Sequence, residues 1–156
     1  MSHQLLGREQ VALDAKHRLS LPTRHRAAVA ALCANKLVLT EHPDGFLVLM
    51  PEPKWQVFSA QFVGAPMSSQ WLKRIVLGSA VFCELDAANR LVLPQELRES
   101  AGIDKQAYLV GVGDHFELWS PEEYQARVAK QKLAHARERE QDEASALQAA
   151  KNEVRW

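Results

Sequence analysis

Two stretches of the chain alternate polar and apolar residues with the two-residue period of a half-buried β-strand. They read "RLSLP" at 18–22 and "RLVLP" at 90–94. An apolar stretch that ends at an aspartate precedes each of them, and two further apolar runs follow each. The pattern therefore predicts two sets of four strands. In chain order the other six runs are "QVALDA" at 10–15, "KLVLT" at 36–40, "GFLVLM" at 45–50, "FCELDA" at 82–87, "AYLVG" at 107–111 and "HFELW" at 115–119.

A short helix is expected between the second and third strands of each set. Pro22 and Pro94 stand where these helices would begin, and a proline at the first helical position loses no needed hydrogen bond. Gly102 is well placed to end the second helix, because glycine adopts the left-handed conformation of a helix C-terminus. Each set thus reads strand, turn, strand, helix, strand, strand. The predicted class is α+β with a mostly β core, built from tandem β-α-β-β repeats.

Further helices are expected outside the two sets. Helical signals cover residues 53–63 and 68–78, between the sets. After the second set, "SPEEY" at 120–124 offers a serine cap, a proline at the first position and a glutamate for a capping box. This helix is expected to run to about residue 140. The alanine-rich tail at 141–156 has two readings, disorder or docking on a neighbouring molecule.

The two sets of strands are copies of one unit. "LDAKHRLSLPTRHR" at 13–26 matches "LDAANRLVLPQELR" at 85–98, and each matched residue is numbered 72 higher in the second copy. Internal repetition of this kind decides how the whole fold is read. We therefore divide the chain into repeat one at 8–54, a helical linker at 55–80, repeat two at 81–124, and a C-terminal helix and tail at 125–156.

A tight turn joins the first two strands of each repeat. An aspartate at the start of a turn can accept hydrogen bonds from backbone amides two residues later, which suits Asp14 and Asp86. The residue before each turn arginine is His17 or Asn89, and both types are enriched at positive φ. Two readings stay open for the aspartate and the arginine. They brace the tip of the hairpin, or they form part of a binding surface.

Composition narrows the classes of function. The formal net charge is zero, so overall charge gives no argument for nucleic-acid binding. No run of eighteen apolar residues is present, so no membrane partner is expected, and the N-terminus lacks the apolar core of a signal peptide. Cys33 and Cys83 are too few for a disulfide framework and lie among apolar residues. Two packed, reduced thiols in a cytoplasmic protein are the expected state.

The two repeats nevertheless differ in local charge. Residues 15–40 contain five lysines and arginines and no aspartate or glutamate, with His17 and His25 beside them. The matching span at 87–109 holds three bases and three acids. A neutral protein can therefore still carry one basic face, and such a face is typical of phosphate binding. A solvated surface without function is the alternative reading.

The turn residues resemble the SpoVT-AbrB DNA-binding motif, and their duplication resembles the MraZ family. The pattern Asp-x-Lys-Gly-Arg, then Leu/Ile-x-x-Pro-x-x-x-Arg, is similar to "DAKHRLSLPTRHR" at 14–26. The second copy is similar through "LGSAVFCELDAANRLVLPQELRESAGI" at 77–103. Two departures matter. The family's glycine is His17 or Asn89 here, and its lysine is Ala88 in the second copy.

The resemblance implies a transcription regulator and a particular fold. In the related fold two β-α-β-β units interlock as a swapped-hairpin (double-split) β-barrel, here formed within one chain. Members of the family bind short direct repeats of double-stranded DNA upstream of the bacterial cell-division and cell-wall gene cluster, and they assemble as rings. A ring-shaped homo-oligomer in the cytoplasm, associated with the nucleoid, is therefore expected. No cofactor, metal or small-molecule substrate is implied.

The expected DNA contacts come mainly from repeat one. Lys16 and Arg18 can donate to guanine edges in the major groove. Phosphates are expected to be held by other basic residues of the same repeat. The matched arginines of repeat two are weaker candidates. The full set of candidate DNA-binding residues is Arg8, Lys16, His17, Arg18, Arg24, Arg26, Arg90 and Arg98, with Asp14, Asp86 and Asn89 as turn-forming residues.

Two other functions are alternatives to DNA binding. A protein-interaction module, such as an antitoxin of the same fold, would use the C-terminal helix to bind its partner. An enzyme is not expected: Asp14, His17 and Ser20 lie close in sequence, but on a hairpin without a nucleophile elbow or a cleft. The six histidines show no metal-binding spacing.

Overall fold

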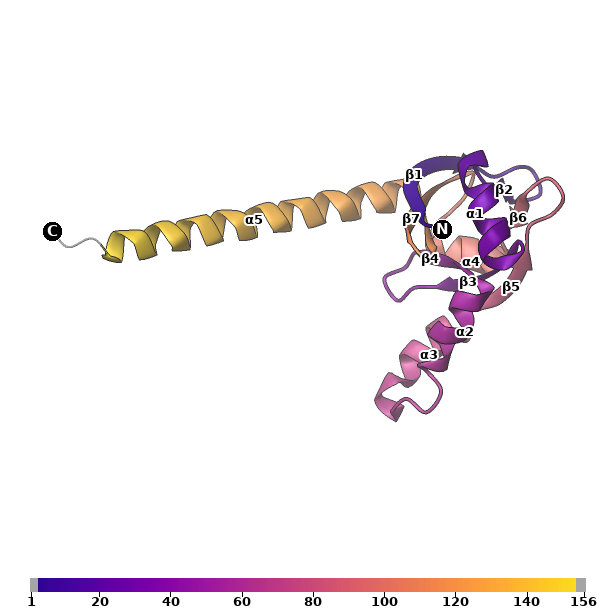
Figure 1. The fold of residues 1–156 in the computed structure, drawn as a ribbon, viewed down its shortest axis with the longest axis horizontal. Helices are drawn as coiled ribbons and strands as arrows, with labels where there is room; N and C mark the ends of the chain where they lie inside the picture. Colours follow the sequence, from indigo (N-terminus) through magenta and orange to yellow (C-terminus); the bar gives the residue numbers. More distant parts are fainter. Residues whose placement is uncertain (1–2, 154–156) are drawn as a thin grey trace. The chain divides into compact units, whose positions relative to one another are not determined.

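A computed structural model describes residues 3–153 and shows the predicted order of elements in both repeats (Figure 1). The fold is α+β with a mostly antiparallel sheet. In chain order the elements are β1 (Leu5–Ala12), β2 (Arg18–Ser20), α1 (Thr23–Cys33), β3 (Lys36–Glu41), β4 (Leu47–Pro51), α2 (Glu52–Ala60), the short 3-10 helix η1 (Met67–Ser69), α3 (Gln70–Val76), β5 (Val81–Glu84), β6 (Arg90–Val92), α4 (Gln95–Ala101), β7 (Gln106–Gly113), β8 (Phe116–Trp119) and α5 (Pro121–Glu153).

The strands of the two repeats are interleaved. A six-stranded sheet has the order β1-β7-β8-β4-β3-β5, and a separate two-stranded ribbon joins β2 to β6. The first strand of each repeat thus pairs with the third strand of the other, as β1 with β7 and β5 with β3. In the ribbon Arg18 lies opposite Val92 and Ser20 opposite Arg90, a register that exchanging the repeats leaves unchanged. The pairings are therefore symmetric under exchange of the repeats.

The sheet is not closed into the expected barrel. Strands β1 and β5 stand at its two ends and do not pair with each other in the described part of the chain. The turn of each repeat leads the chain out of the large sheet, so β2 and β6 form a ribbon of their own (Figure 1). The strand exchange between repeats is present, and closure by hydrogen bonds is not.

One hydrophobic core serves both repeats. Leu19 and Leu91 face each other across the ribbon and are 0% and 1% exposed. They belong to the same cluster of buried side chains as Leu37 of β3, Leu109 of β7 and Phe116 of β8. Truncating a buried leucine to alanine typically costs about 2–5 kcal/mol. Because the cluster draws on both halves, neither repeat has a complete core of its own.

The short helices begin and end close to the predicted places. Pro22 and Pro94 lie just before α1 and α4 and not at the first helical position that the sequence predicted. Their ψ angles of 142° and 145° are extended and not helical. Gly102 ends α4 with φ 67°, as predicted. The linker helices α2 and α3 are shorter than the expected spans. Ser69 precedes α3, but its side chain makes no capping hydrogen bond.

The C-terminal helix is longer than expected. The chain forms two units that divide after Pro121, and α5 makes up the described part of the second. The helix continues through the alanine-rich stretch to Glu153, beyond the expected end near residue 140, so residues 141–153 are not disordered and their docking on a neighbour stays a prediction. Residues 154–156 lie outside the described part. Alanine is the strongest helix former, which explains the continuation. None of the side chains of α5 is buried.

Candidate nucleic-acid interface

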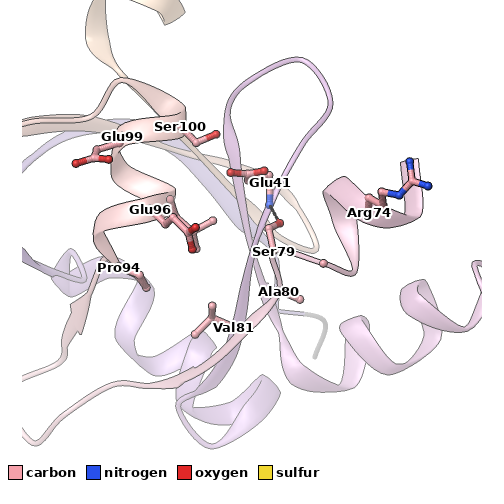
Figure 2. A pocket seen from close by; sticks show the side chains of 11 residues that line it. Glu41, Arg74, Ser79, Ala80, Val81, Pro94, Glu96, Glu99 and Ser100 are labelled. Carbon is pink, nitrogen blue, oxygen red and sulfur yellow. Dashed lines mark hydrogen bonds between the residues drawn. The ribbon is translucent and has the colours of Figure 1, made fainter. Parts of the chain in front are cut away.

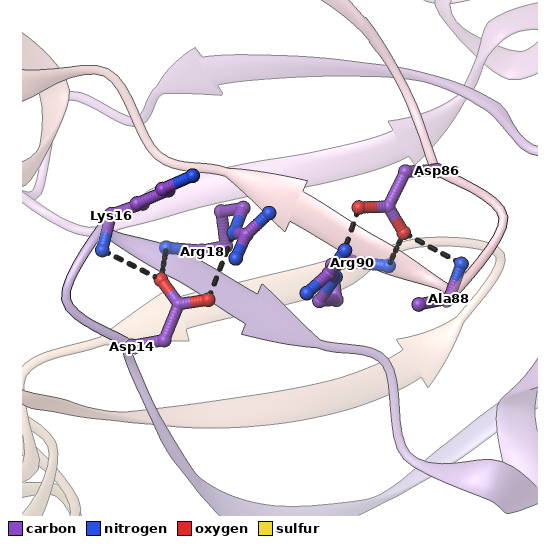
Figure 3. Close-up of polar contacts among 6 residues, drawn as sticks. All are labelled: Asp14, Lys16, Arg18, Asp86, Ala88 and Arg90. Atoms are coloured by element: carbon purple, nitrogen blue, oxygen red, sulfur yellow. Dashed lines mark hydrogen bonds and ion pairs between the residues drawn. The ribbon is translucent and has the colours of Figure 1, made fainter.

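The turn of repeat one is built around the carboxylate of Asp14. Its Oδ1 accepts hydrogen bonds from the backbone amides of Lys16 and Arg18, both at 2.9 Å. Its Oδ2 accepts a 2.8 Å bond from Arg18 Nε (Figure 3). His17 has φ 61°, as predicted from its residue type. The aspartate therefore orders the backbone of the turn and fixes the stem of Arg18 at the same time.

The turn of repeat two repeats this geometry. Asp86 Oδ1 accepts from the amides of Ala88 at 2.8 Å and Arg90 at 2.9 Å. Arg90 Nε donates to Asp86 Oδ2 at 3.0 Å, and Asn89 has φ 58° (Figure 3). The bracing role considered for the aspartate and arginine is therefore present in both copies. It does not compete with binding, because a guanidinium carries five donors and this contact uses one of them.

Two reciprocal backbone hydrogen bonds hold the two turns together, a contact that we call the mutual lock. The carbonyl of Asn89 accepts a hydrogen bond from the amide of Leu21 at 2.9 Å, and the carbonyl of His17 accepts one from Leu93 at 3.0 Å. Each left-handed residue thus presents its carbonyl to the other repeat. Together with the pairing of β2 and β6, these bonds hold both hairpin tips in one ribbon.

Hydrogen bonds control the charge of both aspartates. The amide of Arg18 is the main cause that lowers the pKa of Asp14 below its ordinary value, and the amide of Arg90 does the same for Asp86. Partial burial opposes both shifts. Each turn therefore holds a carboxylate next to an arginine at neutral pH. Lys16 adds a positive charge at the tip of repeat one that Ala88 does not supply in repeat two.

Arg26 and Arg98 have equivalent structural contacts. Arg26 Nε donates to the carbonyl of Leu21, and Arg98 Nε donates to the carbonyl of Leu93, both at 2.9 Å. Each arginine thus ties its helix to the end of the preceding strand. The sequence repeat predicted that these arginines are equivalent, but it did not reveal this backbone contact.

Arg24 and Arg8 also have contacts that sequence reasoning missed. The guanidinium of Arg24 forms an ion pair with Glu9 on β1 and donates to the carbonyl of Leu6 at 3.0 Å. Arg8 lies with its guanidinium carbon 5.6 Å from the ring centre of Tyr108. Glu9 precedes the acid-free span, so no local pattern linked it to Arg24.

His25 is not part of a basic face. It is 3% exposed and packs edge-on against Phe116, with ring centres 4.9 Å apart. Burial is the main cause that lowers the pKa of His25, with the nearby Arg24 acting in the same direction. The imidazole is therefore neutral at physiological pH, and the inclusion of His25 among the basic residues is corrected. By contrast, Lys16 and His17 are exposed at the tip of the turn.

Other kinds of site have no support in the described part of the chain. Between residues 3 and 153 no three histidine, cysteine, aspartate or glutamate side chains gather as metal ligands. In the same stretch, no helix combines the length and the apolar character that a membrane crossing requires. Burial raises the pKa of the Cys83 thiol to about 12, and Cys33 is buried with a raised pKa. Neither thiol is a nucleophile at neutral pH.

Comparison with known proteins gives consistent matches over most of the chain. The profile of the family described as "MraZ protein, putative antitoxin-like" matches residues 5–74 and again residues 76–146. A protein named transcriptional regulator MraZ from Acidovorax sp. (strain JS42) is 49% identical over 123 residues, which cover 79% of this chain and 87% of that protein. Proteins of the same name from Verminephrobacter eiseniae (strain EF01-2) and Burkholderia ambifaria (strain MC40-6) are 48% and 42% identical. Their matches cover 80% and 83% of this chain, and 87% and 89% of the two relatives.

Proposed function

Because the chain belongs to the MraZ family, we propose that it is a transcriptional regulator that binds double-stranded DNA through the β2–β6 ribbon. The observation that carries this proposal is the mutual lock of the two turns, in which His17 and Asn89 accept bonds from the opposite repeat. The lock presents both hairpin tips on one ordered element. A preformed element loses little conformational freedom when it binds.

The side chains at the tips supply the recognition chemistry. Lys16 is exposed, and Arg18 keeps the donors of its terminal nitrogens beside its Nε bond to Asp14. Arginine and lysine to guanine are the commonest specific contacts in the major groove. Arg90 offers a matching guanidinium from repeat two. We propose that these residues read bases, with His17 beside them.

Phosphate contacts are proposed for the remaining arginines, in addition to their structural contacts. Arg24 is 52% exposed in its side chain although it pairs with Glu9. Arg8 is exposed, while Arg26 and Arg98 are half-buried. Their hydrogen bonds to protein groups hold the arginine side chains in place. For Arg24 the ion pair with Glu9 also reduces the positive charge available to DNA. Phosphate contacts position a protein on the duplex without reading its sequence.

The exchange of strands supports a further part of the proposal. We propose that the pairings of β1 with β7 and β5 with β3 are the swapped-hairpin arrangement, in an open form within one chain. Both halves of the symmetric unit are then already paired inside the molecule. We propose that self-assembly uses different surfaces of neighbouring copies, and such contacts close into rings or run on as filaments. A ring suits direct repeats of DNA such as those upstream of the cell-division and cell-wall genes.

A titration of labelled DNA tests the proposal. Wild-type protein should bind a duplex of direct repeats from upstream of its own gene more tightly than a scrambled duplex of equal length. Lys16→Ala should weaken binding, because it removes an exposed base at the ribbon tip. Lys105→Ala removes another exposed lysine, one outside the ribbon, and serves as the control. Equal affinity for both duplexes would contradict the function.

A role as an antitoxin is the second candidate. The family description contains the words antitoxin-like, and α5 offers a long helix without buried side chains. In this case the helix would bind a toxin while the ribbon binds DNA. Purification of the tagged protein from its own host, with mass spectrometry of bound proteins, distinguishes the two. A stoichiometric small partner that depends on α5 would favour the antitoxin.

A further inference from the structure

An acidic hollow, which we call the hollow of repeat two after its wall on α4, lies between α4, the end of the linker and Glu41 of β3. It has a volume of about 550 Å³ and lies between α4 and the segment that leads into β5 (Figure 2). Its lining includes Glu41, Glu96 and Glu99, with the apolar side chains of Val81 and Leu97. Glu96 and Glu99 are exposed. The hollow therefore combines negative charge with an apolar wall.

The corresponding place in repeat one is filled by an arginine of the chain itself. Arg24 Nη2 donates to the carbonyl of Leu6, and its guanidinium pairs with Glu9. Gly7, with φ +92°, passes directly beneath it, and a Cβ at this position would clash with the guanidinium of Arg24. Repeat one thus contains a site built to hold a guanidinium.

Strand register shows that the two places are equivalent. Glu9 and Val81 are 72 residues apart, so they are matching residues of the two first strands. Each pairs with a leucine on the third strand of the other repeat, Glu9 with Leu109 and Val81 with Leu39. By the spacing of 72 residues, Glu96 stands where Arg24 does. In the same way Gly78 and Ser79, which line the hollow, stand where Leu6 and Gly7 do.

Repeat two lacks the internal arginine and carries acids in its place. The side chain of Glu99 accepts a 2.8 Å hydrogen bond from Gln95. The cation in the lining is Arg74 of α3, and Figure 2 shows it beyond Ser79, on the side away from Glu96. Ser79 itself is bound to the amide of Glu41 at 3.0 Å. The side of the hollow formed by α4 therefore keeps its negative charge.

The chain carries a matching set of cations on α5. Lys130 and Arg137 are exposed and seven residues apart, so they lie on one face of the helix. Between residues 127 and 139 there are five lysines and arginines, and Glu138 is the single acid. The arginines of repeat one have structural contacts or stand at the proposed DNA-binding tip. Helix α5 has no buried side chains, and most of the stability of a helix in a protein comes from the packing of one of its faces.

We infer that the acidic hollow of repeat two receives the basic face of α5, at Lys130 and Arg137, from a second copy of this chain. The contact takes the place that Arg24 fills internally in repeat one. It joins two different surfaces, so it is heterologous and can propagate from copy to copy. The inference rests on the proposed self-assembly and names the surfaces that carry it.

Charge reversal on each side tests the contact without touching the core. Glu96→Lys/Glu99→Lys and Lys130→Glu/Arg137→Glu should each weaken self-association about tenfold or more at low salt, as measured by sedimentation velocity without DNA. The matched control is Lys132→Glu/Arg139→Glu, which makes the same change of charge on another face of α5. An equal loss in this control would overturn the inference.

Mixing the two variants gives the decisive result. The hollow variant keeps an intact α5, and the α5 variant keeps an intact hollow. A one-to-one complex should therefore form from two chains that do not assemble alone. Absence of this complex, or wild-type assembly of either variant, would refute the contact. Binding to a single-repeat duplex depends on the ribbon and should be retained in both variants. If the wild-type protein itself does not bind the duplex, this result counts against the proposed function and not against the contact.

Discussion

The carbonyl of His17 in repeat one accepts a hydrogen bond of 3.0 Å from the amide of Leu93 in repeat two. Asn89 and Leu21 make the reciprocal bond at 2.9 Å. Both accepting residues have positive φ, which directs their carbonyls toward the other repeat. The backbone of each turn is thus part of the contact between repeats as well as of the hairpin tip.

The first prediction concerns this left-handed backbone. His17→Gly should leave stability unchanged or raise it by up to about 1 kcal/mol, because glycine adopts positive φ without steric cost. His17→Val should lower stability by about 1–3 kcal/mol, because a β-branched residue is strained there. Urea unfolding measures both, with Asn89→Gly and Asn89→Val as the matched pair. A valine variant as stable as the wild type would show that the turn can rearrange.

The second prediction compares the two turn arginines. Arg18 and Arg90 make the same contact with their aspartates, so both alanine variants should lose similar stability. DNA binding should separate them. Arg18→Ala should cost about 1–3 kcal/mol of binding free energy if Arg18 reads a base edge, and Arg90→Ala clearly less. The reason is the local charge, because Lys16 stands beside Arg18 and Ala88 beside Arg90.

A titration with one fixed DNA, with folding checked by circular dichroism, measures this difference. Equal losses of affinity in two folded variants would contradict the asymmetry between the repeats. They would show instead that the ribbon meets DNA symmetrically.

The third prediction concerns acid. The pKa of Asp14 is lowered in the folded protein, mainly by the amide of Arg18. A lowered folded pKa stabilises the protein above the unfolded value of about 3.9, and this stabilisation is lost as pH falls through the folded value. Asp14→Asn should therefore be less stable than the wild type at pH 7, and the gap should narrow below pH 4.

Thermal unfolding between pH 2.5 and pH 7 measures that gap. Asp86→Asn should behave alike, because Arg90 acts on Asp86 in the same way. Asp104→Asn changes an exposed aspartate outside the turns and is the control. A gap that stays constant with pH would show that the charge of the turn aspartate does not stabilise the fold.

The sequence predicts the local structure of the repeats well, for physical reasons. Alternation in "RLSLP" and "RLVLP" identifies β2 and β6, and their residue types identify His17 and Asn89 as left-handed. These features depend on neighbours along the chain. The interleaving of the two repeats depends on strands far apart in sequence, so periodicity alone does not determine it. It was expected from the family resemblance, and the observed sheet stays open.

The sequence predicted the turns of the candidate site, but it did not predict the ion pairs between residues far apart in the chain. Asp14 and Arg18 are four residues apart in one tight turn, so their contact was one of the two readings of the motif, and the structure shows it. Glu9 and Arg24 meet only because β1 passes beside the start of α1, and no local pattern reveals this. The burial of His25 against Phe116 has the same long-range origin. Counting it as a surface base was therefore an error that only tertiary structure corrects.

The fourth prediction concerns salt. If the ribbon and the neighbouring arginines meet phosphates, the logarithm of affinity should fall linearly with the logarithm of salt concentration. The slope should be about −0.9 for each phosphate contacted, and it should steepen when several copies bind one duplex. Fluorescence anisotropy from 50 to 300 mM salt measures it. A slope near −1 for the whole complex would indicate that the basic residues are only solvated surface.

The last prediction concerns the arrangement of binding sites on DNA. The symmetric pairing of repeats is satisfied inside one chain. If copies assemble through different surfaces, as proposed, they face the same way around a ring. Their ribbons should then match direct repeats, and several weak contacts should add through effective concentration. We expect affinity to fall by more than tenfold when the duplex is shortened to one repeat. Light scattering and titration against duplexes with one, two or three direct repeats, and with one inverted repeat, measure this. A monomer, or a twofold dimer that prefers the inverted repeat, would contradict it.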